Sequence, residues 1–359
     1  VPEPHMTAPF KRILIANRGE IAIRIARACA ELDIASVAAF AEDDHSSLHV
    51  RKADRAVPLQ GRGVAAYLDQ LQWLRLAQAE GCDAIHPGYG FLSENAEFAR
   101  RCAEAGVTFI GPSPAVLDTF GDKAQARALA KQGNVPLLAG LNHAVSFEEA
   151  LDFFNTLPSG AGLMIKALAG GGGRGMRVVT EAGGLAEAFQ QCKNEARNAF
   201  GRDDVYVEQW LPSARHVEIQ VLGDCKGNII ALGERECSLQ RRHQKIMEIT
   251  PSPALSASLR ERMYDAAIQM ASAVKYQGIG TFEFLVETAH GGVNNPQAEH
   301  FYFMEANPRL QVEHTITEMV SGVDIVNTQI RLAAGDSLAS LGLEKAPCSQ
   351  GVSIQARIN

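Results

Sequence analysis

The sequence predicts a protein of mixed α/β and α+β class, with a doubly wound parallel sheet in its N-terminal part. Three observations support this prediction. Short apolar runs alternate with amphipathic helical segments up to about residue 110, and such alternation is typical of parallel sheets covered by helices. Beyond residue 208 the chain becomes rich in strand-like segments. A run of glycines at 170–173 lies between these parts, flanked by apolar segments.

The N-terminal alternation begins with an apolar strand at 11–17 and continues with a helix from about Glu20 to Leu32. The helix is expected because Ile21, Ile25 and Ala28 recur on one helical face. The strands and helices that follow are expected at 36–40, 68–80, 83–86, 94–105 and 107–110. The glycine fingerprint of dinucleotide-binding folds is missing after the first strand, so a nicotinamide cofactor is not indicated.

Changes in composition along the chain predict its domain organisation. The expected parts are a tag or disordered segment at 1–10, an N-terminal α/β domain at 11–120, a helical connector at 121–134, a small lid lobe at 135–206, a main lobe at 207–335 and the beginning of an incomplete further domain at 336–359. Helical structure is expected over 114–132, around this connector. The main lobe is expected to contain strands at 216–221, 229–232, 280–286 and 301–306, a helix at 256–276 and a loop at 287–300.

The composition argues against several classes of function. The 34 lysines and arginines and 41 aspartates and glutamates give a formal net charge of −7, which disfavours a nucleic-acid-binding surface. No apolar run approaches the roughly 18 residues that a membrane span needs. The seven cysteines are scattered and odd in number, which fits reduced thiols better than a disulfide framework. A cytoplasmic location is the default expectation, and import into an organelle stays open.

The glycine run follows a short apolar strand that ends on Lys166. Glycines let backbone N–H groups approach phosphate oxygens, and a lysine adds a positive charge, so this segment is a candidate phosphate-binding lid. A flexible hairpin tip is the alternative. A second lysine, Lys123, begins the connector helix, and taken alone it is expected on the solvated surface.

The run Gln-Arg-Arg-His-Gln-Lys at 240–245 is unusually polar for a segment between apolar strands. A solvated helix face is the usual interpretation of such a run, and a recessed anion-binding site is the alternative. The stretch at 86–95 follows an expected strand and precedes an expected helix, which is the sheet edge where ligands bind in doubly wound folds. A structural turn is also open there, because two glycines and a proline suit a tight bend.

The segment 303–314 gathers two carboxylates, an amide and a guanidinium. Alternation along the strand is expected to place Phe301, Phe303 and Glu305 on one face, with Glu283 on a neighbouring strand. Carboxylate and amide oxygens are the ligands that Mg²⁺ prefers, and this ion commonly also holds the phosphates of a nucleotide. Two ordinary strands with solvated acids are the alternative.

Several of these stretches together resemble the biotin carboxylase component of biotin-dependent carboxylases, an ATP-grasp enzyme related more distantly to the large subunit of carbamoyl phosphate synthetase. The matching stretches are 15–22, 86–95, the glycine loop, 215–221, 240–245 and 305–314, in the family's order and over nearly the whole chain. The resemblance implies an ATP-grasp fold with a mobile glycine-rich lid lobe. It also implies a third domain that continues beyond Asn359.

The resemblance implies a reaction in which ATP and bicarbonate form carboxyphosphate and ADP, after which the carboxyl group moves to N1′ of biotin. The implied nucleotide-binding residues are Lys123, Lys166, Gly171, Gly172, Gly173, Glu208, Trp210, Leu211, His216, Gln240, His243 and Lys245. The implied bicarbonate ligands are Arg309, Gln311 and Val312, and the implied metal ligands are Glu283, Glu305 and Asn307. The implied catalytic residues are Glu313 as the base for bicarbonate, Arg357 as the stabiliser of the biotin enolate oxygen, Arg309 and Lys245.

The implied cofactors are ATP and two Mg²⁺ or Mn²⁺ ions, with biotin as a carried substrate that is not attached to this segment. The implied partners are a biotin carboxyl carrier protein or domain, a carboxyltransferase and further copies of the chain. The residues Asn-Pro-Arg-Leu at 307–310 with His314 and Thr315 lean towards multidomain carboxylases of the pyruvate or long-chain acyl-CoA type. The final carboxyl acceptor is not encoded in this segment.

Two other functions remain open at this stage. The first is another bicarbonate-activating ATP-grasp ligase of the carbamoyl phosphate synthetase type, which would pass its intermediate to ammonia. Arg357 and the 240–245 run favour biotin over this alternative. The second is an inactive nucleotide-binding module used for assembly, against which the complete set of acidic and basic residues at 283–313 argues.

Overall fold

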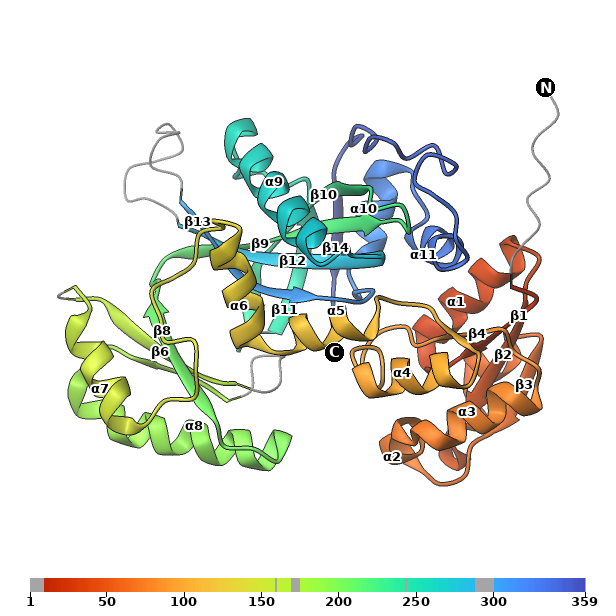
Figure 1. The fold of residues 1–359 in the computed structure, drawn as a ribbon, viewed down its shortest axis with the longest axis horizontal. Helices are drawn as coiled ribbons and strands as arrows, with labels where there is room; N and C mark the ends of the chain where they lie inside the picture. Colours follow the sequence, from red (N-terminus) through yellow and green to blue (C-terminus); the bar gives the residue numbers. More distant parts are fainter. Residues whose placement is uncertain (1–9, 159, 169–174, 243, 288–299, 359) are drawn as a thin grey trace.

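The computed structural model describes residues 10–158, 160–168, 175–242, 244–287 and 300–358 (Figure 1). In this part of the chain the strands form three sheets, which contain five, three and six strands. The predicted N-terminal tag, Gly171, Gly172, Gly173, His243 and most of the predicted loop 287–300 lie outside the described residues.

The first sheet is parallel and has the strand order β3-β2-β1-β4-β5. Its strands are β1 (Arg12–Ile15), β2 (Ala35–Phe40), β3 (Arg55–Pro58), β4 (Ala84–His86) and β5 (Thr108–Phe109). Ile13 and Ile15 pack in one apolar cluster with helix α1 (Gly19–Glu31), whereas Leu14 packs in a second cluster on the other face. This alternation buries both faces, so the predicted doubly wound parallel sheet is confirmed.

The other helices of this part are the 3₁₀ helices η1 (Glu42–Asp44) and η2 (Leu48–Arg51), with α2 (Gly63–Leu68), α3 (Gln70–Ala79) and α4 (Ala96–Glu104). The strand β3 was not predicted, because it is short, lies at the sheet edge and contains a proline.

The helical connector predicted over 114–132 consists of two helices, α5 (Pro114–Gly121) and α6 (Lys123–Gln132), and Lys123 begins the second as predicted. Asp122 separates them, with non-helical φ and ψ of −104° and 111°. Its carboxylate accepts hydrogen bonds from the backbone N–H groups of Ala124 and Gln125. An aspartate that caps a new helix in this way ends the preceding one.

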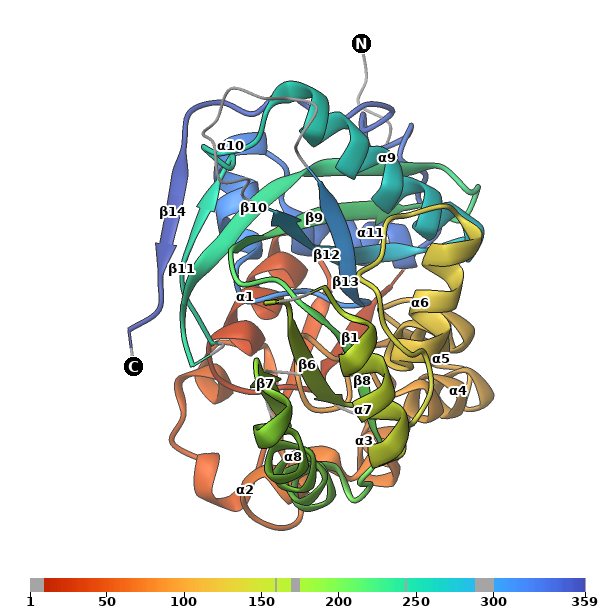
Figure 2. The same cartoon turned by 90° about the vertical axis from the view of Figure 1, so that its left-hand side faces the viewer.

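A small lobe follows, in which β7-β6-β8 form an antiparallel sheet. Its elements are α7 (Phe147–Thr156), β6 (Gly162–Ala167), β7 (Met176–Val179), η3 (Ala182–Gly184), α8 (Leu185–Phe200) and β8 (Val205–Trp210). The apolar side chains of this lobe form their own cluster, which includes Ile165, Leu185 and Val207. In Figure 1 the lobe lies to the lower left of the large sheet, and in Figure 2 its helices α7 and α8 lie below that sheet.

The large sheet has the order β13-β12-β9-β10-β11-β14 and is antiparallel. Its elements are β9 (Ala214–Gly223), β10 (Ile229–Arg241), β11 (Gln244–Thr250), α9 (Ala257–Ala273), β12 (Gly278–Glu287), β13 (Phe301–Asn307), α10 (His314–Ser321), α11 (Ile325–Ala333) and β14 (Ser353–Ala356). The polar run at 240–245 spans the end of β10 and the start of β11, so its interpretation as a helix face is wrong. The strand predicted at 229–232 continues to Arg241.

The two faces of the large sheet differ in chemistry. On one face Val217, Ile219 and Phe282 are buried with residues of α9. On the other face the neighbouring residues of β9, which include Glu218 and Gln220, are polar and buried. Because side chains alternate along a strand, one short sequence supplies both surfaces.

A β-bulge overturns the predicted arrangement of β13. The residue pairs Phe284–Phe303 and Glu283–Glu305 are opposite each other in the two strands, so β13 contains one extra residue between them. Phe303 therefore lies in the core with Phe284, whereas Glu305 shares the polar face with Glu283. The expectation that Phe301, Phe303 and Glu305 occupy one face is wrong, because strict alternation does not hold through a bulge.

Candidate active site

The polar face of the large sheet is organised around Arg235, a fully buried guanidinium on β10. Arg235 donates to the Gln220 side chain at 2.9 Å and to Glu218. Further donor contacts reach the side chains of Thr281, Gln311 and Thr317. A buried charge is stable only when it is paired and hydrogen-bonded, and this network meets that condition. Arg235 thus ties three strands to the segments that follow β13.

A second cation, Lys245, lies among three buried carboxylates. Its Nζ contacts Glu313 at 2.8 Å and Glu283 at 3.0 Å, and it also contacts Glu218. Burial would lower the pKa of Lys245, but the three negative charges outweigh this effect and raise its pKa well above the usual range. Lys245 therefore carries a fixed positive charge at the centre of the polar face.

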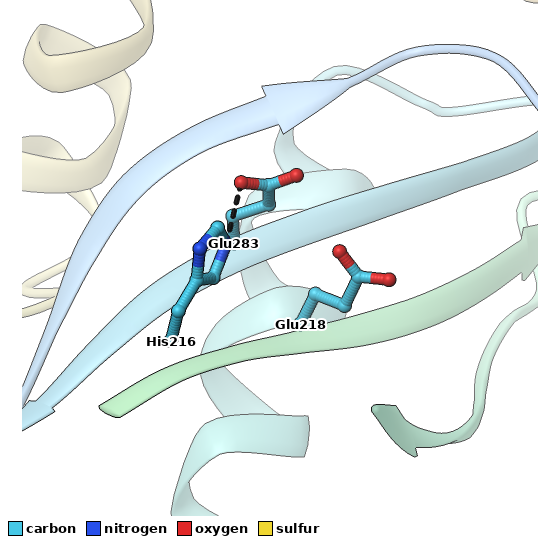
Figure 3. Close-up of side chains that lie close together, drawn as sticks. All are labelled: His216, Glu218 and Glu283. Atoms are coloured by element: carbon cyan, nitrogen blue, oxygen red, sulfur yellow. Dashed lines mark ion pairs between the residues drawn. The ribbon is translucent and has the colours of Figure 1, made fainter. Parts of the chain in front are cut away.

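His216 and Glu283 form an ion pair, which Figure 3 shows together with Glu218. Lys245 contacts the same glutamate. The Nε2 atom of His216 lies 2.7 Å from Oε2 of Glu283. Burial would lower the pKa of His216, but the charge of Glu283 prevails and raises it. In turn, the positive charges of Lys245 and His216 overcome the effect of burial and hold the pKa of Glu283 well below its usual range. Gln240 lies 2.8 Å from Nδ1 of His216 and fixes the other side of the ring.

Glu313 faces the same cluster from the segment after β13. Burial alone would raise its pKa, but Lys245, Arg235 and Arg357 lower the pKa of Glu313 to about 2. NH2 of Arg357 donates to Oε2 of Glu313 at 2.9 Å, and Nε of Arg357 donates to Oε1 of Glu248 at 2.6 Å. Arg357 follows β14 directly, so the edge strand of the sheet delivers this guanidinium to the site.

The bicarbonate ligands expected from the sequence lie next to this cluster. Nε2 of Gln311 donates to Glu283 at 3.2 Å. NH2 of Arg309 donates to the Asn307 side-chain oxygen at 3.1 Å, and its Nε lies 2.9 Å from Glu94. Val312 is half-buried between the two buried residues Gln311 and Glu313. Because Glu94 belongs to the stretch 86–95, that turn contributes a charged side chain to the site as well as a bend.

The three expected metal ligands lie on the same face of the sheet. Glu283 and Glu305 are opposite each other on β12 and β13, and Nδ2 of Asn307 donates to Oε1 of Glu283 at 2.8 Å. Glu305 lies 4.0 Å from Nζ of Lys123. Two carboxylates and an amide offer hard oxygen ligands, so these residues fit Mg²⁺ or Mn²⁺ by donor chemistry. An ion bound to Glu283 would compete with Lys245 and His216 for its oxygens.

The expected nucleotide ligands form a neighbouring group at the start of the lid lobe. Lys166 on β6 pairs with Glu208 on β8, and Arg127 of α6 lies 3.2 Å from the same carboxylate. Burial lowers the pKa of Lys123, with Glu305 acting in the opposite direction. The charges around Lys166, mainly that of Glu208, outweigh burial and raise its pKa. The remaining members, Trp210 at the end of β8 and Leu211 after it, are half-buried.

Sequence reasoning assigned no role to Glu218, Arg235, Glu248 and Arg127, which all contact expected site residues. For Glu218, the sequence does contain a signal. His216, Glu218 and Gln220 alternate with valine and isoleucine on β9, a pattern that indicates a strand with one polar face. No comparable pattern marks the other three residues, and their partners are distant in the sequence.

A parallel α/β domain, a small antiparallel lid sheet and a large antiparallel sheet with a polar, charged face define an ATP-grasp enzyme. Two family models agree with this class. Residues 9–117 match "Biotin carboxylase, N-terminal domain", and residues 122–341 match "Carbamoyl-phosphate synthase L chain, ATP binding domain".

Similar solved structures identify the family within the ATP-grasp class. A biotin carboxylase from Campylobacter jejuni, solved as a beta-gamma-ATP complex, is 39% identical with a TM-score of 0.91, over 97% of this chain and 75% of that chain. The biotin carboxylase domain dimer of the Hydrogenobacter thermophilus 2-oxoglutarate carboxylase, solved with MgADP, ADP and bicarbonate, is 42% identical with a TM-score of 0.88, over 97% and 74%. This chain belongs to the biotin carboxylase family, as its motifs predicted.

The curated relatives are longer proteins. The pyruvate carboxylase of Staphylococcus aureus is 49% identical over 97% of this chain but only 30% of its own length. The mitochondrial pyruvate carboxylase of Rattus norvegicus is 47% identical over 98% of this chain and 29% of its own length. The chain thus spans about 30% of the length of these relatives. No helix among the described residues is long and apolar enough to cross a membrane.

Proposed function

We propose that this chain catalyses the ATP- and bicarbonate-dependent carboxylation of biotin, the first half-reaction of a biotin-dependent carboxylase. The observation that carries this proposal is the convergence of Lys245, Glu313 and Arg357. These residues come from β11, from the segment after β13 and from the position directly after β14. Lys245 contacts Glu313 at 2.8 Å, and Arg357 contacts the other oxygen of Glu313 at 2.9 Å. A cation, a base and a second cation placed together suit a reaction that first activates and then transfers a carboxyl group.

In the proposed complex, the nucleotide lies between the lid lobe and the polar face of the large sheet. Lys123, Lys166 and His216 contact its phosphates, while Glu208 and the backbone of 208–211 hold the adenine. The glycines Gly171, Gly172 and Gly173, with Gln240 and His243, complete the nucleotide ligands. Arg127 supports this assignment, because it neutralises Glu208 when Lys166 turns to the phosphates. A buried carboxylate left without a cation would be costly.

Two Mg²⁺ or Mn²⁺ ions are proposed at Glu283, Glu305 and Asn307. When bound, they supply positive charge to the phosphoryl group during its transfer. Nζ of Lys123 lies 4.0 Å from Oε2 of Glu305, so this carboxylate has a cation nearby. In the absence of an ion, His216 and Lys245 neutralise Glu283, which allows this carboxylate to stay buried.

Bicarbonate is proposed to bind Arg309, Gln311 and Val312, where a planar guanidinium matches a planar oxyanion. Glu313 accepts the bicarbonate proton. At neutral pH it is ionised, as a base must be, but a carboxylate with a pKa of about 2 is a weak base. The proposal therefore requires Lys245 to turn from Glu313 towards the phosphate during the reaction. That movement would raise the pKa of Glu313 when the base is needed.

The products of the first step are ADP and carboxyphosphate. Carboxyphosphate then divides into carbon dioxide and phosphate, and the phosphate removes the proton from N1′ of biotin. The N1′ atom bonds to carbon dioxide and gives carboxybiotin. Arg357 stabilises the negative charge that develops on the biotin ureido oxygen.

The proposed partners are a biotin carboxyl carrier domain or protein, a carboxyltransferase and a second copy of the chain. The relatives support them, since one neighbour is described as a domain dimer and another is a single-chain, multi-domain long-chain acyl-CoA carboxylase. We propose a cytoplasmic location, supported by seven free cysteines, because free thiols persist in reducing compartments. Import into an organelle stays open, because some relatives are mitochondrial.

The first experiment measures ADP release with Mg²⁺ and bicarbonate, with and without free biotin, together with carboxybiotin. We expect biotin to stimulate ADP release and carboxybiotin to form. Bicarbonate-dependent ADP release without any effect of biotin would favour a ligase of the carbamoyl phosphate synthetase type. Nucleotide binding without turnover, also in a longer chain, would favour an inactive assembly module.

A further inference from the structure

A carboxylate behind Arg357 takes no part in the reaction proposed above. Glu248 is on β11, it is fully buried, and Nε of Arg357 donates to its Oε1 at 2.6 Å. The other edge of the same guanidinium donates to Glu313 at 2.9 Å. Arg357 is therefore held between a carboxylate in the site and a carboxylate beneath it.

The backbone alone leaves the Arg357 side chain free to turn. Its N–H group donates to the Ile246 carbonyl at 2.9 Å, and Met247 pairs with Ala356 in the adjoining strands. These contacts fix the position of the Cα atom, but an arginine side chain retains about 2 kcal/mol of rotamer entropy. A second anchor is needed to keep the guanidinium in one direction, and the bond from Nε to Glu248 supplies it.

The surroundings of Glu248 support a role that depends on Arg357. Its Oε2 atom is buried and has no hydrogen-bond partner among the described residues. Burial raises the pKa of Glu248, and the charge of Arg357 opposes this effect. Glu234 on the opposite face differs, because both of its oxygens accept hydrogen bonds, from Ser252, Arg260 and Tyr264.

We propose that Glu248 is a positioning residue for Arg357. It holds the guanidinium through Nε so that its remaining N–H groups face the biotin ureido oxygen. This inference rests on the proposed biotin carboxylation. Arg357 acts in the second step, so loss of Glu248 affects biotin-dependent turnover more than bicarbonate-dependent ATP hydrolysis without biotin.

The test compares Glu248→Ala, which removes the acceptor, with Glu248→Gln, whose amide oxygen still accepts from Nε. We expect Glu248→Ala to lower biotin-dependent turnover by roughly 10- to 100-fold, the usual loss when a carboxylate that orients a metal-site ligand is removed. Glu248→Gln should lose less than Glu248→Ala. In both variants, the KM for ATP and the rate of ATP hydrolysis without biotin should stay within about twofold of wild type.

A double-mutant cycle tests whether Glu248 acts through Arg357. In an Arg357→Met background, Glu248→Gln should lower biotin-dependent turnover by less than about twofold further, because the group that it orients is absent. Independent, multiplying losses in the double variant would overturn the proposal. Because this comparison uses Glu248→Gln, it does not depend on the folding of Glu248→Ala.

Glu234→Gln is the matched control, since Glu234 is a buried carboxylate of the same sheet with an arginine at 2.8 Å. It should leave the ratio of biotin-dependent to biotin-independent ATP hydrolysis unchanged. Equal losses of biotin-dependent and biotin-independent ATP hydrolysis in the Glu248 variants would overturn the positioning role. The proposed function would still stand in that case if the wild-type chain forms carboxybiotin. A wild-type chain that makes no carboxybiotin would overturn both.

Discussion

The two faces of the large sheet use the same strands for opposite purposes. On β9, Val217 and Ile219 pack against α9, whereas Glu218 between them is paired with Arg235 and Lys245. The apolar face is stabilised by non-directional packing, which another apolar side chain of similar size can also provide. On the polar face, each buried charge needs its specific partner. A substitution on the apolar face should change the free energy of unfolding, and a substitution on the polar face should change the rate of the catalysed reaction.

Glu313→Gln should give the largest effect. The variant keeps the shape of the side chain but cannot take the bicarbonate proton, so bicarbonate-dependent ADP release should fall by about 1,000-fold, within the usual range for a general base. The dissociation constant for ATP, measured by equilibrium binding, should stay within about twofold. Unchanged turnover would remove Glu313 from its proposed role and weaken the contrast between the faces.

Acid should affect the polar face more than the apolar face. The pKa of Glu313 falls from 4.5 to about 2 on folding, so the stability linked to this group is fully present above about pH 4.5 and lost as the pH approaches 2. That shift corresponds to a loss on the order of 3 kcal/mol. Unfolding free energies measured between pH 2 and 7 should fall less steeply in Glu313→Gln than in wild type. If the unfolding free energies of the two proteins depended on pH in the same way, the pKa of Glu313 would not be lowered on folding.

Lys245→Gln removes the cation that Glu218, Glu283 and Glu313 share. We expect bicarbonate-dependent ADP release to fall by about 100-fold and the KM for ATP to rise, because the remaining carboxylates repel the phosphates. Steady-state kinetics at varied ATP concentrations tests both effects. Lys131→Gln, a change in a lysine near the end of α6, serves as the control. Normal kinetics in Lys245→Gln would mean that this charge is not needed for catalysis.

Ile219→Val should show the smallest effect. This substitution tests the apolar face of the large sheet. Removing one methylene from this fully buried side chain should cost about 1 kcal/mol of stability. Turnover at a temperature where the protein is folded should not change. Denaturant unfolding and ADP release measured on the same preparation would test this. A drop in turnover would show that the packing beneath β9 also sets the geometry of the site.

The sequence predicted the N-terminal sheet well because its strands and helices are local, periodic and separated by clear turns. It failed at β13, where one extra residue moves Glu305 to the polar face and no pattern in the sequence marks that position. The partners of Arg235 could not be predicted either, since Gln311 and Thr317 are brought to it only by the fold. Metal ligands and catalytic roles were named by resemblance, and these roles stay predictions.

The lid lobe has an apolar cluster of its own, formed by residues that include Ile165 and Val207. A rotation of this lobe about its connections to the main lobe would leave that cluster, and the one beneath α9, packed as they are. Closing over the proposed nucleotide then costs little beyond the bending of the connecting segments, because the two apolar clusters have no residue in common in the described part of the chain. In amide hydrogen exchange the lobe should therefore open as one cooperative unit, with protection that rises when a nucleotide is added.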